Sequence, residues 1–268
     1  MHIHFIDPYR PLISPIHALD VRVKFVLTLA FIITCSLTPF AAWPAYVLLF
    51  GIVLSVEILS GLGISYVMPR AALALPFALA AFPVVFGTEG RVIFSLSFGG
   101  SSIPATLEGL ERFISIVLKS WLSVQAAIVL AASSPFPELL QAMRAVGVPK
   151  LLVAMFGLMW RYLFVLVDEA LRLLRARAAR SGHGAQPGVK PGGTVLWRAR
   201  VAGDMTGSLL LRAFERSERI YMAMLSRGYD GETRSLPRPS ITVPAWFILI
   251  AGLVLCLFVL LLGLSFRR

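Results

Sequence analysis

The sequence has few charged residues and few cysteines for its length. Only 15% of its 268 residues are Asp, Glu, Lys or Arg, and 57% are apolar, whereas soluble domains have about 25% charged and 45–50% apolar residues. This composition excludes an ordinary water-soluble enzyme. With only two cysteines the chain is not a disulfide-stapled secreted module, and both of them, Cys35 and Cys256, lie in apolar stretches where we expect buried thiols.

Histidines and nucleotide-binding motifs are also scarce. The four histidines lie outside the predicted spans and form no cluster for catalysis; they are His2, His4, His17 and His183. We assign no metal site, because the His-x-His pair at the start of the chain has no third ligand at a predictable spacing. The Gly-rich segment 182–193 lacks the Gly-x-x-x-x-Gly-Lys-Ser/Thr spacing of a phosphate loop, so we interpret it as a flexible link. If ATP is used, another subunit must bind it.

The sequence does contain several long apolar runs. A spanning helix needs about 20 mostly apolar residues. The charge-free run 25–56 is too long for one span, and Pro39 and Pro44 in its middle predict a helical hairpin. Further spans are predicted over 71–88, kinked by its two prolines, over about 106–133 and over 241–264. The sequence therefore predicts an all-α polytopic membrane protein with about five transmembrane helices.

The positive charge is concentrated in one part of the chain. Residues 141–240 contain 16 Lys and Arg against 7 Asp and Glu, which is +9 of the total +11. The positive-inside bias places this block in the cytoplasm. Segment 151–167 is apolar enough to suggest a sixth span, but a span there would put most of the block on the side opposite Arg22, Lys24 and Arg70. We therefore predict transmembrane helices 1–4 over residues 1–134, a cytoplasmic domain over 135–238 and a final span over 239–268.

Two long helices are predicted in the cytoplasmic domain. The first starts after Pro149 and runs to about Ser181, apolar in its first half and charged in its second. The second runs from about Thr194 to Ser226, and glycines follow it as natural stops. Six residues of the second helix repeat at helical spacing and form a stripe that we expect to pack on the first helix; they are Leu210, Ala213, Phe214, Ser217, Tyr221 and Met224. Both helices end in an arginine beside small residues.

Several segments in a fixed order carry a family resemblance. They are Leu19 to Lys24, Val146 to Pro149, Trp160 to Ala170 and Met224 to Gly231. On these segments the chain resembles the transmembrane T component of energy-coupling factor (ECF) transporters, in particular the CbiQ version for cobalt. The family has two short Ala-Arg-Gly-like motifs that end two cytoplasmic coupling helices. Here they match Ala179-Arg180-Ser181, with Ser181 where glycine is usual, and Ser226-Arg227-Gly228; Arg177 is an alternative register for the first.

The resemblance implies a non-catalytic scaffold within an ATP-driven importer in the bacterial inner (cytoplasmic) membrane. The coupling domain of crossed helices would contact two ABC-type, CbiO-like ATPase subunits, with Arg180 and Arg227 in grooves on them. Arginine suits such a contact because it stays charged and offers a planar fork of donors. The other implied partners are a CbiM-like substrate-binding membrane subunit and a small CbiN-like subunit. This chain would bind no cofactor: ATP and Mg²⁺ belong to the ATPases, and Co²⁺ belongs to the substrate-binding subunit.

Some alternatives stay open at the level of sequence. Nickel and vitamin importers use related T components, and nothing in the chain identifies the cargo. A self-contained secondary transporter would show inverted repeats, which we do not find. Nucleic-acid binding is not predicted, because the basic block contains no binding module. Glu57 and Lys119 lie in or at the ends of spans, where a charge is either functional or placed at an interface.

Overall fold

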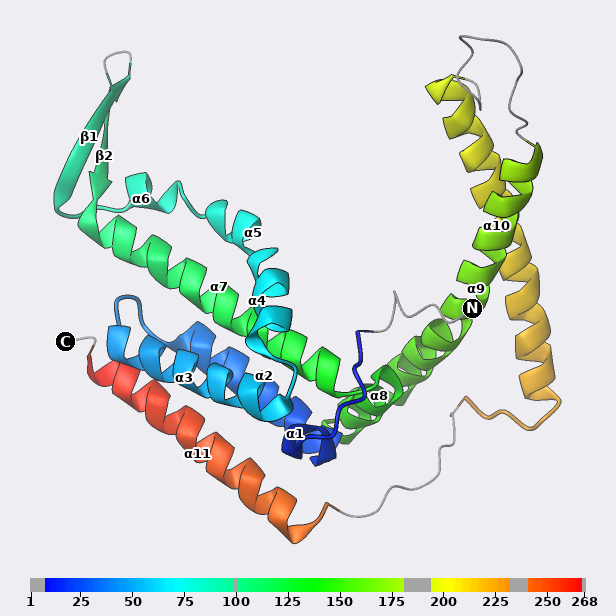
Figure 1. Cartoon of the computed structure of the whole chain (residues 1–268), viewed down its shortest axis with the longest axis horizontal. Helices are drawn as coiled ribbons and strands as arrows, with labels where there is room; N and C mark the ends of the chain where they lie inside the picture. The colour runs from blue at the N-terminus through cyan, green and yellow to red at the C-terminus, as the bar shows by residue number, and fades with distance from the viewer. Residues whose placement is uncertain (1–7, 99–100, 181–193, 232–240, 267–268) are drawn as a thin grey trace. The chain divides into compact units, whose positions relative to one another are not determined.

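The computed structural model describes residues 8–98, 101–180, 194–231 and 241–266. The chain forms two compact units. The first comprises residues 1–147 and 238–268 and contains the predicted membrane spans, and the second comprises residues 148–237 and contains two long helices (Figure 1). The predicted fold class is confirmed, since helices dominate and several are long and apolar enough to cross a membrane. The assignment of the domains to sides of the membrane stays a prediction.

Four apolar helices lie side by side in the first unit (Figure 1). They are α2 (Val21–Leu37), α3 (Trp43–Ser60), α7 (Leu107–Ser133) and α11 (Val243–Ser265). The predicted hairpin is confirmed, because α2 ends at Leu37 and α3 begins at Trp43. Helix α2 has 17 residues and is at the short end of the length that can span. Two shorter helices, α1 (Pro15–Ala18) and α8 (Phe136–Ala145), also belong to the first unit, and α8 packs on α2.

The prediction of one kinked span over 71–88 is wrong. The segment consists of three short helices, α4 (Ile64–Ala72), α5 (Leu75–Leu79) and α6 (Val84–Gly87). Pro76 lies in the first turn of α5 and Pro83 is the N-cap residue of α6. Each proline lacks the amide that would continue the preceding helix. The backbone between the helices instead makes turns with hydrogen bonds to the third residue back.

The Gly-rich stretch after this segment is an antiparallel hairpin of β1 (Val92–Phe98) and β2 (Ser101–Thr106), which the sequence analysis did not predict. Thr106 ends the hairpin and caps α7, because its hydroxyl accepts a hydrogen bond from the Gly109 amide. Gly109 also allows α6 to approach α7, since a Cβ atom there would lie 2.5 Å from the carbonyl oxygen of Val85. The start of α7 is therefore fixed by one threonine and one glycine.

Two lysines join α2 and α7 at opposite ends. Lys24 near the start of α2 is almost fully buried, and its ammonium donates a 3.0 Å hydrogen bond to the carbonyl of Ser133, the last residue of α7. Lys119 in α7 donates to the carbonyls of Ser36 and Thr38 at the end of α2. Each ammonium therefore satisfies carbonyls that a helix end leaves unpaired, and it does so where the helix dipole is negative.

Small residues bring α11 against its neighbours. A Cβ atom at Gly252 would lie 2.5 Å from the Leu27 side chain of α2, so glycine is what allows this close approach. Val259 is fully buried in the main apolar cluster with residues of α2, α3 and α7. Cys35 and Cys256 belong to the same cluster as free, buried thiols, which confirms their predicted environment.

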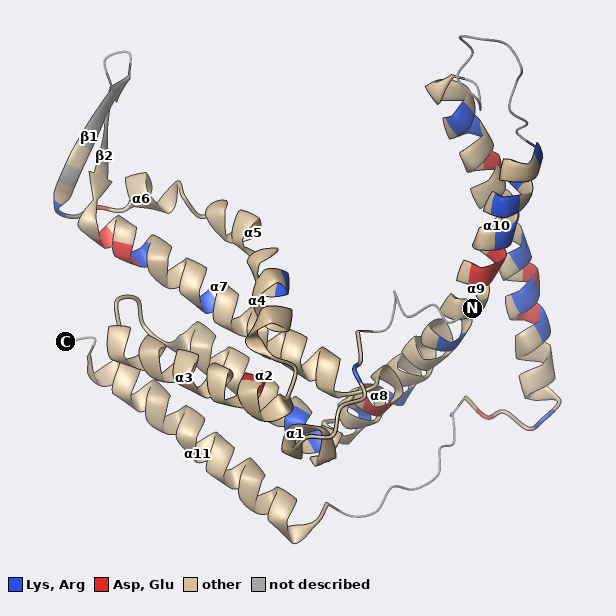
Figure 2. Cartoon of the chain, viewed as in Figure 1, with Lys and Arg blue, Asp and Glu red and all other residues tan. Residues whose placement is uncertain are grey.

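The second unit consists of α9 (Lys150–Arg180) and α10 (Val195–Leu225), each 31 residues long. Both predicted helices are confirmed. The Pro149 carbonyl accepts the first hydrogen bonds of α9, and the hydroxyl of Thr194 caps α10 by accepting from the Trp197 amide. The predicted link 182–193 lies outside the described residues. Figure 2 shows the charged residues gathered on α9 and α10, while α11 has none.

Candidate functional site

The second arginine motif forms the complete C-cap of α10. The amide of Gly228 donates to the Leu225 carbonyl (2.9 Å), and the amide of Tyr229 donates to the Met224 carbonyl (3.0 Å). These two bonds define a Schellman motif. Gly228 has a φ of +78°, a conformation that favours glycine. Arg227 is thereby held between the end of the helix and the turn.

The two predicted coupling arginines are both exposed. Arg227, with its neighbours Ser226 and Gly228, is exposed at the end of α10. Ala179 and Arg180 are exposed at the end of α9. The remaining predicted residue of the first motif, Ser181, lies outside the described residues. Figure 1 shows that the C-terminal ends of α9 and α10 point in different directions.

The two candidate arginines of the first motif, Arg180 and Arg177, differ in exposure. Arg180 is the last residue of α9 and is exposed, whereas Arg177, the alternative, is half-buried. The choice between the two arginines stays a prediction. Exposure at the helix end is what a docking residue requires, and this favours Arg180.

A carboxylate with two arginine partners connects the long helices where they cross. Glu169 of α9 is bound by Arg216 of α10 (Oε2 to Nη2, 2.8 Å) and by Arg212 (Oε1 to Nη1, 3.5 Å). Its side chain is only 11% exposed. Desolvation acts to raise the pKa of Glu169, but the hydrogen bonds and positive charges of Arg216 and Arg212 outweigh this and lower the pKa below its ordinary value. The sequence analysis missed this contact, because Glu169 is more than 40 positions away from both arginines.

The prediction that an apolar stripe of α10 is buried against α9 is wrong for the described residues. Leu210, Phe214 and Tyr221 are each more than half exposed, and α10 has no buried residue. Its apolar side chains exceed what the single crossing with α9 can cover. This uncovered surface is typical of a helix that packs against another chain or a membrane surface.

The first half of α9 is also apolar and exposed. Leu151, Met155 and Met159 recur at i, i+4 and i+8, and each is more than half exposed. By length and composition α9 could cross a membrane. The charge distribution instead favours a helix that lies along the membrane surface in its first half and leaves it in its charged second half. This placement stays a prediction.

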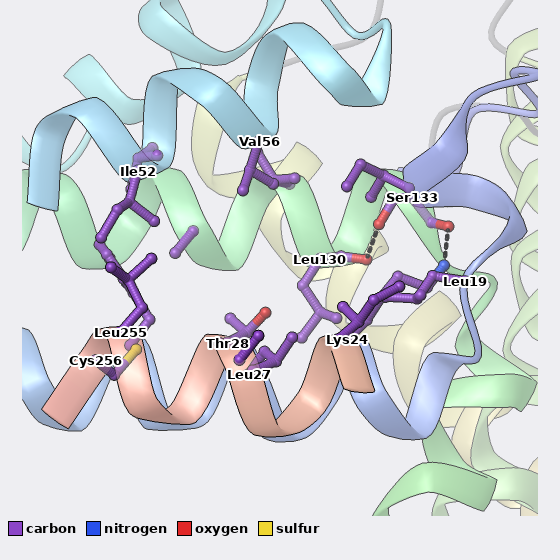
Figure 3. A pocket seen from close by; sticks show the side chains of 18 residues that line it. Leu19, Lys24, Leu27, Thr28, Ile52, Val56, Leu130, Ser133, Leu255 and Cys256 are labelled. Carbon is purple, nitrogen blue, oxygen red and sulfur yellow. Dashed lines mark hydrogen bonds between the residues drawn. The ribbon is translucent and has the colours of Figure 1, made fainter. Parts of the chain in front are cut away.

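The first unit contains an apolar cavity of about 440 Å³ between α2, α3, α7 and α11 (Figure 3). Leu27, Val56 and Leu255 are among its walls, and Lys24 reaches the Ser133 carbonyl at one end. No Asp, Glu or His is among its 18 lining residues. A mostly apolar lining suits hydrocarbon better than a hydrated metal ion.

The two intramembrane charges raised by the sequence have different environments. Lys119 binds helix-end carbonyls, which gives it a structural explanation. Glu57 lies in α3 with no exposure at all, and neither of its carboxylate oxygens has a hydrogen-bond partner. The sequence left open a functional or an interfacial position for Glu57, and the structure shows a carboxylate enclosed by protein. The side-chain oxygen of Gln125 in α7 is likewise buried without a partner.

A search for metal ligands gives no candidate site among the described residues. No group of three or more His, Cys, Asp or Glu side chains lies close enough together there to hold an ion. His2 and His4 lie outside these residues.

Comparisons with known proteins agree with this architecture. The family described as "Cobalt transport protein" (CbiQ) matches residues 13–241. The cobalt transport protein CbiQ of Rhodobacter capsulatus is 28% identical over 73% of this chain and 75% of its own length. The energy-coupling factor transporter transmembrane protein EcfT of Thermosediminibacter oceani is 30% identical over 84% of each chain. A fused cobalt transport protein CbiMQ of Methanocorpusculum labreanum is 26% identical over 93% of this chain and 41% of that protein.

The fold and these similarities define a multi-pass membrane protein of the ECF type, a transmembrane transport component. The chain belongs to the CbiQ cobalt transport protein family, which the family resemblance in the sequence predicted.

Proposed function

We propose that this chain is the coupling scaffold of an ATP-driven ECF importer in the bacterial inner membrane. The observation that carries the proposal is the pair of exposed arginines, Arg180 and Arg227, at the ends of two 31-residue helices that cross at Glu169. A long helix transmits displacement, because its backbone hydrogen bonds make it stiff. A movement imposed at either arginine is therefore carried to the crossing and along α9.

Each arginine would dock on one of two ABC-type, CbiO-like ATPase subunits. A guanidinium offers five donors in a fixed fork, and it makes the strongest contacts with carboxylates and backbone carbonyls when water is partly excluded. The Schellman cap holds the backbone of Arg227 in a defined position, so docking need not order the backbone there. ATP and Mg²⁺ would be bound by the ATPases, and this chain would bind no cofactor of its own.

The cargo and the remaining partners are proposed from the relatives. The names CbiQ and CbiMQ indicate cobalt and a CbiM-like membrane subunit, and in the CbiMQ relative the two are fused in one chain. Co²⁺ would be held by that subunit, with a small CbiN-like subunit beside it. The exposed apolar surfaces of the first unit would contact the CbiM-like subunit and the lipid bilayer.

Co-purification tests the proposal. The tagged chain, expressed with its neighbouring genes, should retain two ATPase subunits and a substrate-binding membrane subunit, and cells with all subunits should take up Co²⁺. The chain purified alone should not hydrolyse ATP. Hydrolysis that survives removal of every ATPase subunit, or Co²⁺ uptake by this chain alone, would contradict the scaffold function.

A further inference from the structure

Two arginines stack on one tyrosine at the end of the first unit where α2 and α4 begin and α7 ends. The Cζ atom of Arg10 lies 3.9 Å from the centroid of the Tyr66 ring, and that of Arg70 lies 3.7 Å from it. A ring face has room for one guanidinium at such a distance, so the two groups occupy opposite faces. Their separation is then at most about 7.6 Å, the sum of the two distances, which is within the Debye length of ~10 Å at 0.1 M salt.

The arrangement is built rather than incidental. Tyr66 is 9% exposed, and its hydroxyl donates to the Pro8 carbonyl. The Arg10 amide donates to the Ala132 carbonyl near the end of α7. The Arg70 guanidinium turns back one helical turn to donate to the Tyr66 carbonyl (3.0 Å). Three segments that are distant in sequence thus hold two like charges close together.

Neither guanidinium has an acidic partner in the part of the chain that the structure describes. Both arginines are exposed, and among the described residues neither forms an ion pair. The aromatic ring compensates each charge in part, but the repulsion between the two cations remains. An anion that bridges them would remove this repulsion and use donors that otherwise face water.

We propose that Arg10 and Arg70, stacked on Tyr66, bind the phosphate of an anionic phospholipid. The positive charges at this end of the unit, which include Arg22 and Lys24, place it at the cytoplasmic surface, where anionic headgroups and basic residues meet. A strongly exposed apolar face continues from Arg70, with Leu73 72% exposed and Phe77 83% exposed. Leu73 directly follows α4 and Phe77 lies in α5, so exposed apolar side chains continue beyond Arg70 and provide a surface for an acyl chain while the headgroup stays at the arginines. This apolar continuation favours a lipid over a free phosphate.

Lipid retention by the purified full chain tests the proposal. The protein is exchanged into phosphatidylcholine nanodiscs with an increasing fraction of phosphatidylglycerol, and bound phosphatidylglycerol is counted by native mass spectrometry. The double variant Arg10→Gln/Arg70→Gln should need about 30-fold more phosphatidylglycerol for the same occupancy, and each single variant about 5-fold more. Tyr66→Phe keeps the ring and loses only the bond to Pro8, so it should retain most of the binding. Tyr66→Leu should lose binding although both charges remain.

Arg22→Gln is the matched control, since it removes the same charge from the same end and Arg22 contacts no ring among the described residues. It should retain the lipid. An equal loss in Arg22→Gln and in the double variant would show a general charge effect and overturn the proposal, as would unchanged retention in the single variants. Release of the lipid by millimolar inorganic phosphate alone would show a free-anion site and overturn it too.

Discussion

Gly228→Ala offers a clean perturbation of the arginine motif. A Cβ atom at Gly228 would have no atom within 4 Å, so the substitution introduces no clash. Its effect comes from the backbone alone, because φ is +78° and an L-residue in the left-handed region costs roughly 1–2 kcal/mol. The substitution should destabilise the Schellman cap by this amount, so the cap should open about 5- to 30-fold more often.

Hydrogen–deuterium exchange measures this opening directly. The amides of Gly228 and Tyr229 make the two cap bonds, so residue 228 and Tyr229 should exchange faster by the same factor in Gly228→Ala. Gly207→Ala is the matched control, because Gly207 lies within α10 and also has open space around it. There alanine should stabilise the helix by about 0.5–1 kcal/mol and slow exchange. Unchanged exchange at 228 and 229 would refute the reasoning that glycine is required by the cap.

Three further outcomes follow from the buried and paired charges. Lys24→Met should lower the stability of the first unit by about 2 kcal/mol in thermal unfolding, because the end of α7 loses a buried charged donor; the half-buried Lys119, changed to Met, should have a smaller effect. Glu57→Leu should raise stability by about 1–2 kcal/mol and leave uptake unchanged, since two unpaired buried oxygens are removed; loss of uptake with normal expression would instead give Glu57 a function. The pKa of Glu169 is lower in the folded chain than in the unfolded chain. The ion pairs of Glu169 therefore stabilise the fold fully at a pH above the unfolded-state pKa, and this stabilisation is lost as the pH falls through the folded-state pKa. A spin-label distance between α9 and α10 across the crossing should be the same at pH 7 and pH 5.5 and should increase only in stronger acid.

The helices were predictable where local signals agree. Thr106 and Thr194 are capping residues directly before long periodic runs, and the structure places the starts of α7 and α10 immediately after them. Pro39 and Pro44 marked the turn of the hairpin for the same local reason. The arginine at the end of α10 could be placed because Gly228 is a strong stop signal in any sequence.

The remaining features depend on contacts between distant residues. The sequence shows Pro76 and Pro83, but their spacing alone does not distinguish a bent helix from three short ones. The contacts of Glu169 with α10 and of Lys24 with α7 join residues that are far apart in sequence and leave no periodic signal. The stripe on α10 was correctly identified as apolar, but periodicity does not reveal whether a partner helix from the same chain covers it.

Retention of ATPase subunits by Arg227→Glu tests the coupling account most directly. Arg200→Glu is the matched control, because Arg200 is an exposed arginine of the same helix that is distant from its C-terminal end. Removing one partner of a desolvated charge pair at an interface costs roughly 2–5 kcal/mol. Arg227→Glu should therefore retain less than about a tenth of the ATPase, Arg180→Glu should also weaken retention, and Arg200→Glu should behave like the original chain. Full ATPase retention by Arg227→Glu, with the protein inserted at normal levels, would contradict the account.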